Sequence, residues 1–123
     1  MDATDRAQRL KLDTRLAILD NITALNRQRK AAIQAGNAGQ MNAIQDSINA
    51  QHDQLDDLSF ISLKTLEDSP AVKKTLTKLR GAADKLEDEA DNIKTVADAL
   101  QKAARIIDQT AKIITELRAL APV

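Results

Sequence analysis

Apolar residues recur at alternating spacings of three and four through the second half of this 123-residue chain, from Pro70 to Ala119. One column of the repeat holds aliphatic side chains, which are Val72, Leu79, Leu86, Ile93, Leu100, Ile107 and Ile114. The other column begins with Leu76, continues with Ala83, Ala90, Ala97, Ala104 and Ala111, and ends at Arg118. An alternation sustained over about six heptads is typical of a helix packed along a coiled-coil seam. The pattern therefore predicts one long helix over residues 70–119.

The alanine column indicates a close partner helix. Without large side chains between them, two helices approach more closely than the usual interaxial distance of about 8–10 Å. Parallel two-stranded coiled coils usually fill both columns with bulky residues, so we expect an antiparallel partner, in the same chain or in a second copy. The predicted interaction seam consists of Leu86, Ile93, Ala97, Leu100, Ala104, Ile107, Ala111, Ile114 and Leu117. Plain core packing of a small bundle is the alternative explanation.

Composition indicates an all-helical domain. Only three Gly and two Pro are present, which leaves little material for turns and favours few, long elements. No stretch shows the alternation of a β-strand. A chain of this length forms one domain with a core. The predicted fold is all-α over residues 1–123, with an antiparallel helical hairpin and one long C-terminal helix. The bundle is expected to be elongated and coiled-coil-like, with three or four helices.

The first two helices are expected over about residues 5–35 and 38–66, and the second ends near either Leu58 or Leu66. Thr4 or Asp5 is a suitable N-cap for the first. Its expected buried stripe is Leu12, Leu16, Leu19, Ile22, Leu25 and Ile33, with Leu10 and Ile18 beside the stripe and widening it. The turn between the helices is Ala35-Gly36-Asn37-Ala38-Gly39. Gln51 interrupts the stripe of the second helix, where it either fixes register inside the seam or reaches water at its edge.

The segment from Ser59 to Ser69 fits no single stripe. Either the second helix turns a different face to the core there, or it breaks and restarts with Ser59 as its cap. Ser69 and Pro70 form a clear helix start, because serine caps the N-terminus and proline fits the first helical position. Gly81 lies opposite the seam and does not shift the heptads, so we expect the long helix to continue through it.

The expected lengths favour association. At about 1.5 Å per residue, the first two helices would each be roughly 40–45 Å long and the third roughly 75 Å. The hairpin would leave part of the seam uncovered. We therefore expect a protein partner or a homo-oligomer.

Candidate chemistry is sparse. His52, the only histidine, lies near Asp53, Asp56 and Asp57, a set that forms a polar face or a weak cation site. The Glu-x-x-His motif of carboxylate-bundle metal sites is absent. No glycine-rich phosphate loop occurs, and there is no Cys. We expect no catalytic, metal or cofactor-binding residue.

Charge and hydropathy argue against several partners. Lys plus Arg and Asp plus Glu both number 18, so no net charge attracts nucleic acid or anionic lipid. The charged N-terminal stretch does not resemble a signal peptide, and no run is apolar enough for a membrane span. These features predict a soluble cytoplasmic protein, with export without a cleaved signal left open.

Two functions are compatible with these features. The first is a non-enzymatic adaptor, scaffold or assembly subunit that binds a protein through the predicted seam. The second is a membrane-active or pore-forming protein that uses the amphipathic stretch 103–121. Its polar face carries few cations and no aromatic residue, which disfavours membrane binding.

Overall fold

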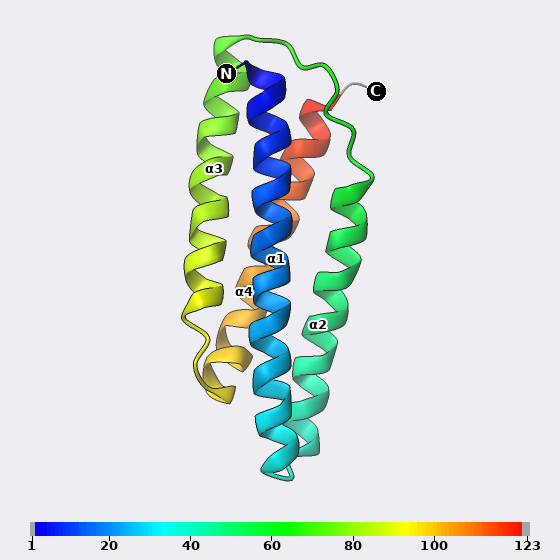
Figure 1. Ribbon diagram of the computed structural model, residues 1–123, viewed down its shortest axis with the longest axis vertical. Coiled ribbons are helices and arrows are strands. Elements are labelled where there is room, and N and C mark those ends of the chain that lie inside the picture. Colours follow the sequence, from blue (N-terminus) through cyan, green and yellow to red (C-terminus); the bar gives the residue numbers. More distant parts are fainter. Residues whose placement is uncertain (1, 122–123) are drawn as a thin grey trace.

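The computed structural model describes residues 2–121, and in this range it contains four helices and no strand. They are α1 (Ala3–Gln34), α2 (Ala38–Ser59), α3 (Pro70–Asp91) and α4 (Val96–Leu120). The chain runs down α1, up α2, across the top of the bundle, down α3 and up α4 (Figure 1). The prediction of an all-helical bundle is confirmed.

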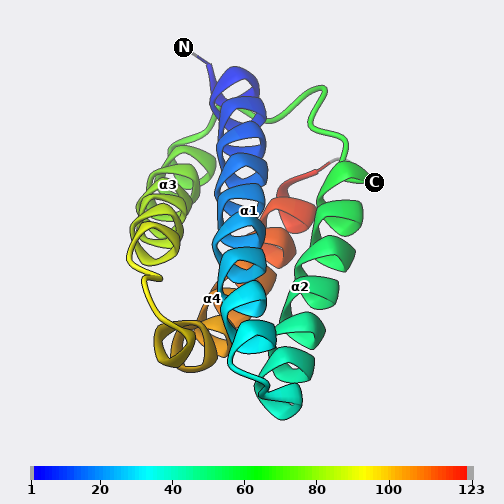
Figure 2. The same ribbon diagram turned by 60° about the horizontal axis from the view of Figure 1, so that its bottom comes forward.

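The helices occupy the four corners of the bundle. α1 packs against each of the other three helices, whereas α2 and α3 do not contact each other. The order around the bundle is therefore α1, α2, α4, α3, with α1 and α4 at opposite corners (Figures 1 and 2). The outward faces of α1 and α4 consequently point to opposite sides of the molecule.

The first turn lies where the sequence predicts it. Gly36 has a φ of 72°, the left-handed conformation that ends a helix without strain only at glycine. The Asn37 N–H donates to the Ala32 carbonyl at 3.0 Å, as in a Schellman motif. The Asn37 side chain then accepts from the Gln40 N–H and caps α2. At the other end of α1, Asp2 and not Thr4 or Asp5 is the N-cap, so the predicted cap was wrong.

The second helix ends at Ser59, close to the earlier of its two expected ends. The longer range to Leu66 was wrong, and no helix restarts before Pro70. The connecting segment 60–69 instead buries Ile61, Leu63 and Leu66 at the top of the bundle. Side chains of α1 satisfy its backbone: Gln8 Nε2 donates to the Leu63 carbonyl, Lys11 Nζ donates to the Ile61 carbonyl, and the Leu66 N–H donates to Thr4 Oγ1. These long-range partners replace the hydrogen bonds that a helix would supply.

The predicted long helix over 70–119 is also wrong, because the chain turns between Asp91 and Val96. Thr95 and Asp98 form a capping box that starts α4: each side chain accepts a hydrogen bond from the other residue's backbone N–H. Asn92 closes α3 by donating from Nδ2 to the Asp88 carbonyl at 2.8 Å. As predicted, Ser69 caps α3 and Gly81 lies inside it without a break.

The break removes the length mismatch on which the expectation of association was based. α3 and α4 contain 22 and 25 residues, which correspond to roughly 33 and 38 Å. They fold back on each other and pack beside α1 and α2 (Figure 2). No uncovered half of a long helix remains.

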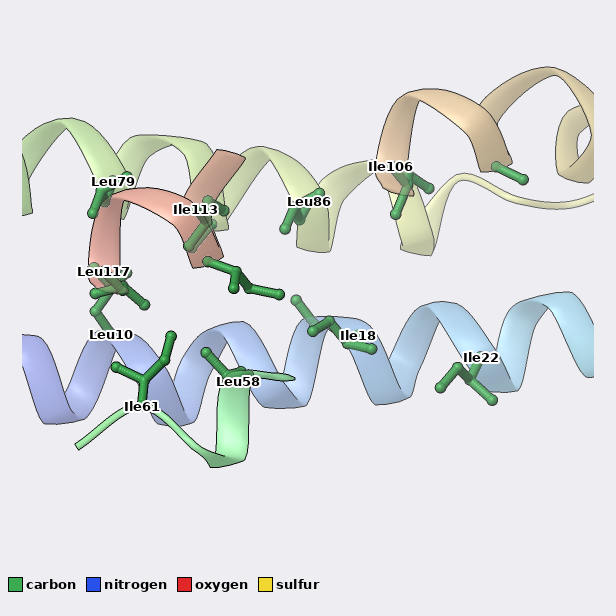
Figure 3. Packing of buried hydrophobic residues seen from close by; sticks show 14 of the residues in the cluster. Leu10, Ile18, Ile22, Leu58, Ile61, Leu79, Leu86, Ile106, Ile113 and Leu117 are labelled. Atoms are coloured by element: carbon green, nitrogen blue, oxygen red, sulfur yellow. The ribbon is translucent and has the colours of Figure 1, made fainter. Parts of the chain in front are cut away.

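One hydrophobic core joins the four helices and the connecting segment (Figure 3). In α3 both columns of the predicted heptad point inward, and Leu76, Leu79, Ala83, Leu86 and Ala90 are buried. In α1 the predicted stripe is buried only in part. Leu10, Ile18, Ile22 and Leu25 are buried together with five alanines, whereas Leu12, Leu16 and Ile33 are about half exposed. The small inner residues of α1 allow it to pack against α4 across the centre of the bundle.

A chain of amide hydrogen bonds crosses this core. Asn21 of α1 donates to Gln51 Oε1 of α2 at 2.9 Å, and Gln51 in turn donates to Gln54 Oε1. Gln54 Nε2 donates to the Ile107 carbonyl of α4 at 2.8 Å. Gln51 is fully buried and lies in the middle of this chain, so it belongs to the interior and not to a water-exposed edge. The polar chain ties α1, α2 and α4 together in one register.

Candidate interaction surface

Helix α4 carries two adjacent apolar rows, and only one of them faces the core. The inner row is buried and consists of Ala99, Ala103, Ile106, Thr110, Ile113 and Leu117. The outer row lies one residue further along at each step and consists of Ala97, Leu100, Ala104, Ile107 and Ala111. Leu100 is 38% exposed, Ile107 is half-buried, and the three alanines are exposed. The core is therefore filled without the outer row.

The predicted interaction seam is divided between these environments. Leu86, Ile93, Ile114 and Leu117 belong to the core of the chain's own bundle. The other five residues of the seam are those of the outer row. The cause is the turn at residues 92–95: the buried position after Ile93 is Ala99 and not Leu100, so the register of the core shifts by one residue between α3 and α4.

Helix α2 borders the outer row with acidic side chains. The hydrogen bond from Gln54 to the Ile107 carbonyl fixes which side of α2 faces α4. Beside Gln54, spacings of four, three and four place Asp46, Ala50, Asp53 and Asp57 in one row along the same side of the helix. The three aspartates are exposed. The outer row and this aspartate row together form an apolar surface with an acidic edge, here called the α4/α2 surface.

Helix α1 also carries exposed leucines. Leu12 is 54% and Leu16 49% exposed, and Leu19 lies in the same row at the next step. Charges of both signs flank these residues: Arg9, Arg15 and Arg27 are exposed, and Asp13 and Asp20 line a groove together with Leu16. We call this row of leucines with its arginines the α1 surface.

The net charges of α1 and α2 are opposite in sign, and the aspartates of α2 and the exposed arginines of the α1 surface take part in no ion pair among residues 2–121. α1 contains seven basic and three acidic residues, whereas α2 contains four aspartates and no Lys or Arg. Among residues 2–121, the ion pairs link Lys73 to Asp68, Lys78 to Glu116, Arg80 to Asp13, Arg105 to Glu89 and Lys112 to Asp108. None of these pairs includes an aspartate of α2 or a cation of the α1 surface. Both sets of charges therefore face solvent.

Comparison with known sequences and structures identifies no relative of this chain. The chain matches no known family model, no curated protein and no solved structure. The function has to be argued from the chain's own surfaces.

Two carboxyl groups meet in the groove between α1 and α3, a feature that the sequence did not reveal. Glu87 and Asp20 line this groove of about 290 Å³ together with Asp13, Leu16, Arg80, Ala83 and Asp84. A hydrogen bond with the Asp20 side chain raises the pKa of Glu87 to about 7, and partial burial and the negative charges of Asp20, Asp91 and Asp88 act in the same direction. Only the packing of α1 beside α3 brings these distant residues together.

The other acidic candidate lies on the surface. His52, Asp53, Asp56 and Asp57 are all exposed on α2. Within the described range, no three His, Asp or Glu side chains are arranged to hold a metal ion. None of the helices in that range is long and apolar enough to cross a lipid bilayer.

Proposed function

We propose that this protein is a non-enzymatic interaction module that binds another protein through the outer row of α4. The observation that carries the proposal is a second apolar row, beside a core that is already complete. Ala97, Leu100, Ala104, Ile107 and Ala111 contribute little to that core, yet they are uniformly apolar over four helical turns.

The chemistry of the outer row supports helix docking. Its alternation of alanine with leucine or isoleucine gives shallow recesses next to larger side chains, into which the ridges of another helix can pack. A solvent-facing helix side normally carries charged or polar residues at such positions. Contiguous exposed apolar residues next to a polar border are typical of protein interaction sites.

Membrane binding is less well supported. It would require α4 to leave the bundle, because Ile106, Ile113 and Leu117 of the stretch 103–121 are buried in the core. That release would expose the centre of the core, and nothing among the described residues favours it.

The proposal is tested by measuring mass in solution with light scattering over a dilution series. We expect wild-type protein, with a monomer mass of 13.4 kDa, to increase in mass with concentration or to acquire mass when its partner is added. Ala104→Glu places a charge in the middle of the outer row and should abolish this increase, while circular dichroism shows unchanged helicity.

Ala71→Glu is the matched control, because Ala71 is also exposed but lies at the start of α3 and outside the α4/α2 surface. It should behave like wild type. If Ala104→Glu and Ala71→Glu both associate as wild type does, the outer row is not an interface.

A further inference from the structure

The N-terminal parts of α1 and α3 lie side by side at the top of the bundle, and a cavity between them is lined by Arg6, Arg9 and Arg80 (Figure 1). We infer that this arginine cavity binds the dianionic phosphate group of a small molecule. The inference goes beyond the proposed function, because no described residue of α4 lines the cavity. It is based on the charge of the cavity, the orientation of its guanidinium groups and its volume.

The arginine cavity is positively charged. Among the described residues that line it, Asp13 is the one carboxylate beside the three arginines. Asp13 pairs with Arg80, whereas Arg6 and Arg9 take part in no ion pair among residues 2–121. Two positive charges therefore remain without a partner. A phosphate monoester carries close to two negative charges at neutral pH, because its second pKa is about 6.

The neighbouring residues do not neutralise these charges. Arg6 and Arg9 are three residues apart, so they share one face of α1 and repel each other. Asp5, one turn before Arg9, forms no ion pair among the described residues. Across the cavity, residues 70–83 of α3 include three lysines and Arg80 but no Asp or Glu. An anion between the two helices would remove this repulsion.

The acidic groove that contains Glu87 is a separate feature. It lies further along both helices and shares only Asp13 and Arg80 with the arginine cavity. Because these two residues pair with each other, the shared part adds no net charge to the arginine cavity.

Two of the three guanidinium groups are held in place by the opposite helix. Arg6 Nη2 donates to Thr77 Oγ1 at 2.9 Å, and Arg80 Nη1 donates to the Asp13 carboxylate. A guanidinium group has five N–H donors, so both arginines keep donors for a ligand. Since these side chains are already ordered, they lose less conformational entropy on binding than free arginines do. Arg9 is exposed and supplies the third, adjustable guanidinium group.

The volume of the arginine cavity fits a small phosphorylated molecule. It is about 450 Å³, within the range of about 300–1,000 Å³ that is common for ligand sites. Leu10 and Leu76, which are 1% and 2% exposed, add apolar surface to the lining. The arginines therefore offer paired N–H donors to phosphate oxygens, and the leucines offer a contact for an organic group.

Titration with inorganic phosphate and with phenyl phosphate tests the inference. Each compound is added to ¹⁵N-labelled protein at constant ionic strength and a pH of about 7.5, where the second phosphate proton is released. We expect saturable amide shifts around the cavity, with a dissociation constant on the order of 1 mM for inorganic phosphate. Tighter binding of phenyl phosphate would identify a phosphate monoester as the ligand, and equal affinities would identify free phosphate.

Arg9→Gln is the decisive variant, because Arg9 is exposed and its replacement should not affect folding. It should weaken phosphate binding about fivefold or more through loss of a charge-assisted contact. Arg15→Gln removes the same charge from an exposed position of α1 outside the cavity, so it is the matched control and should change the affinity less than about twofold. Equal weakening by both substitutions would mean that phosphate responds only to the general charge of α1, and the inference would be wrong. Shifts that do not saturate at about 20 mM phosphate, well above the expected dissociation constant, would also overturn it.

Discussion

Helices α3 and α4 share one heptad pattern in the sequence but use it differently in the structure. In α3 both columns of the pattern are buried. In α4 the same columns lie mostly outside, and the neighbouring row from Ala99 to Leu117 fills the core. The turn between the helices causes this change, because it restarts the helix with a new rotation relative to the core. An apolar row in the sequence therefore does not by itself say which side of the helix faces the core.

Replacing two adjacent isoleucines of α4, one in the inner row and one in the outer row, should give the largest difference in stability. Ile106 is 1% exposed, so Ile106→Ala should lower the free energy of unfolding by about 2–5 kcal/mol through lost burial and a cavity. Ile107→Ala removes the same atoms from a half-buried position and should cost about 1 kcal/mol or less. Urea unfolding of both variants measures the difference. Equal losses would mean that both rows lie in the core.

Interrupting the chain of amide hydrogen bonds that links α1, α2 and α4 should cause the next largest loss of stability. Gln51→Leu removes the link between Asn21 and Gln54 and leaves buried polar groups unpaired, which should cost about 1–3 kcal/mol. Gln34→Leu, at an exposed position at the end of α1, is the control and should be nearly neutral. If Gln51→Leu is as stable as wild type in urea, the amide chain does not stabilise the fold.

A variant without the capping box tests what causes the one-residue shift in core register between α3 and α4. Thr95→Ala removes the cap of α4 and should destabilise the protein by about 1 kcal/mol without increasing its helix content. Thr115→Ala, at an exposed position inside α4, should change stability little. Thermal unfolding followed by circular dichroism compares the two. A Thr95→Ala variant that gains both helicity and stability would indicate that α3 and α4 prefer to join.

Replacing Glu87, whose carboxyl group meets that of Asp20 between α1 and α3, should give the smallest change in stability. The pKa of Glu87 is raised to about 7 from an ordinary value of 4.5, so the folded state holds a proton that the unfolded chain has already released in this range. The stability associated with this proton is fully present below pH 4.5 and is lost as pH rises through 7. Glu87→Gln should therefore be slightly more stable than wild type at pH 8, because Glu87 is only partly buried and solvent screening reduces the effect, and its Tm should vary less with pH between pH 5 and 8. Identical profiles for the two proteins would exclude a shared proton with Asp20.

The sequence was sufficient for the helical class, the turn at Gly36, the start of α3 at Pro70 and the continuity through Gly81. It was misleading about which rows are buried. In α4 the outer row is entirely apolar, whereas the inner row contains Thr110, whose hydroxyl is satisfied by the Ile106 carbonyl of its own helix. In α1 the exposed leucines are larger than the alanines that pack inside. Close approach of the diagonal helices favours the smaller residues, and that preference depends on the tertiary structure.

Two further features could not be obtained from local patterns. The segment 60–69 stays extended because side chains of Thr4, Gln8 and Lys11, more than forty residues away, satisfy its backbone. The Asp20–Glu87 pair likewise depends on how α1 lies beside α3. In contrast, the turn at 92–95 had a local signal in Thr95-x-x-Asp98, which the unbroken heptad pattern obscured.

Thiol reactivity at neighbouring positions tests the division into inner and outer rows most directly, because the chain has no Cys of its own. Ala103 is 4% exposed, so the thiol of Ala103→Cys should be protected from a disulfide reagent at every protein concentration. The thiol of Ala104→Cys should react rapidly in dilute solution and become protected as association covers the outer row. Equal reactivity at the two positions would contradict the register described for α4, and reactivity of Ala104→Cys that does not depend on concentration would contradict self-association through this row.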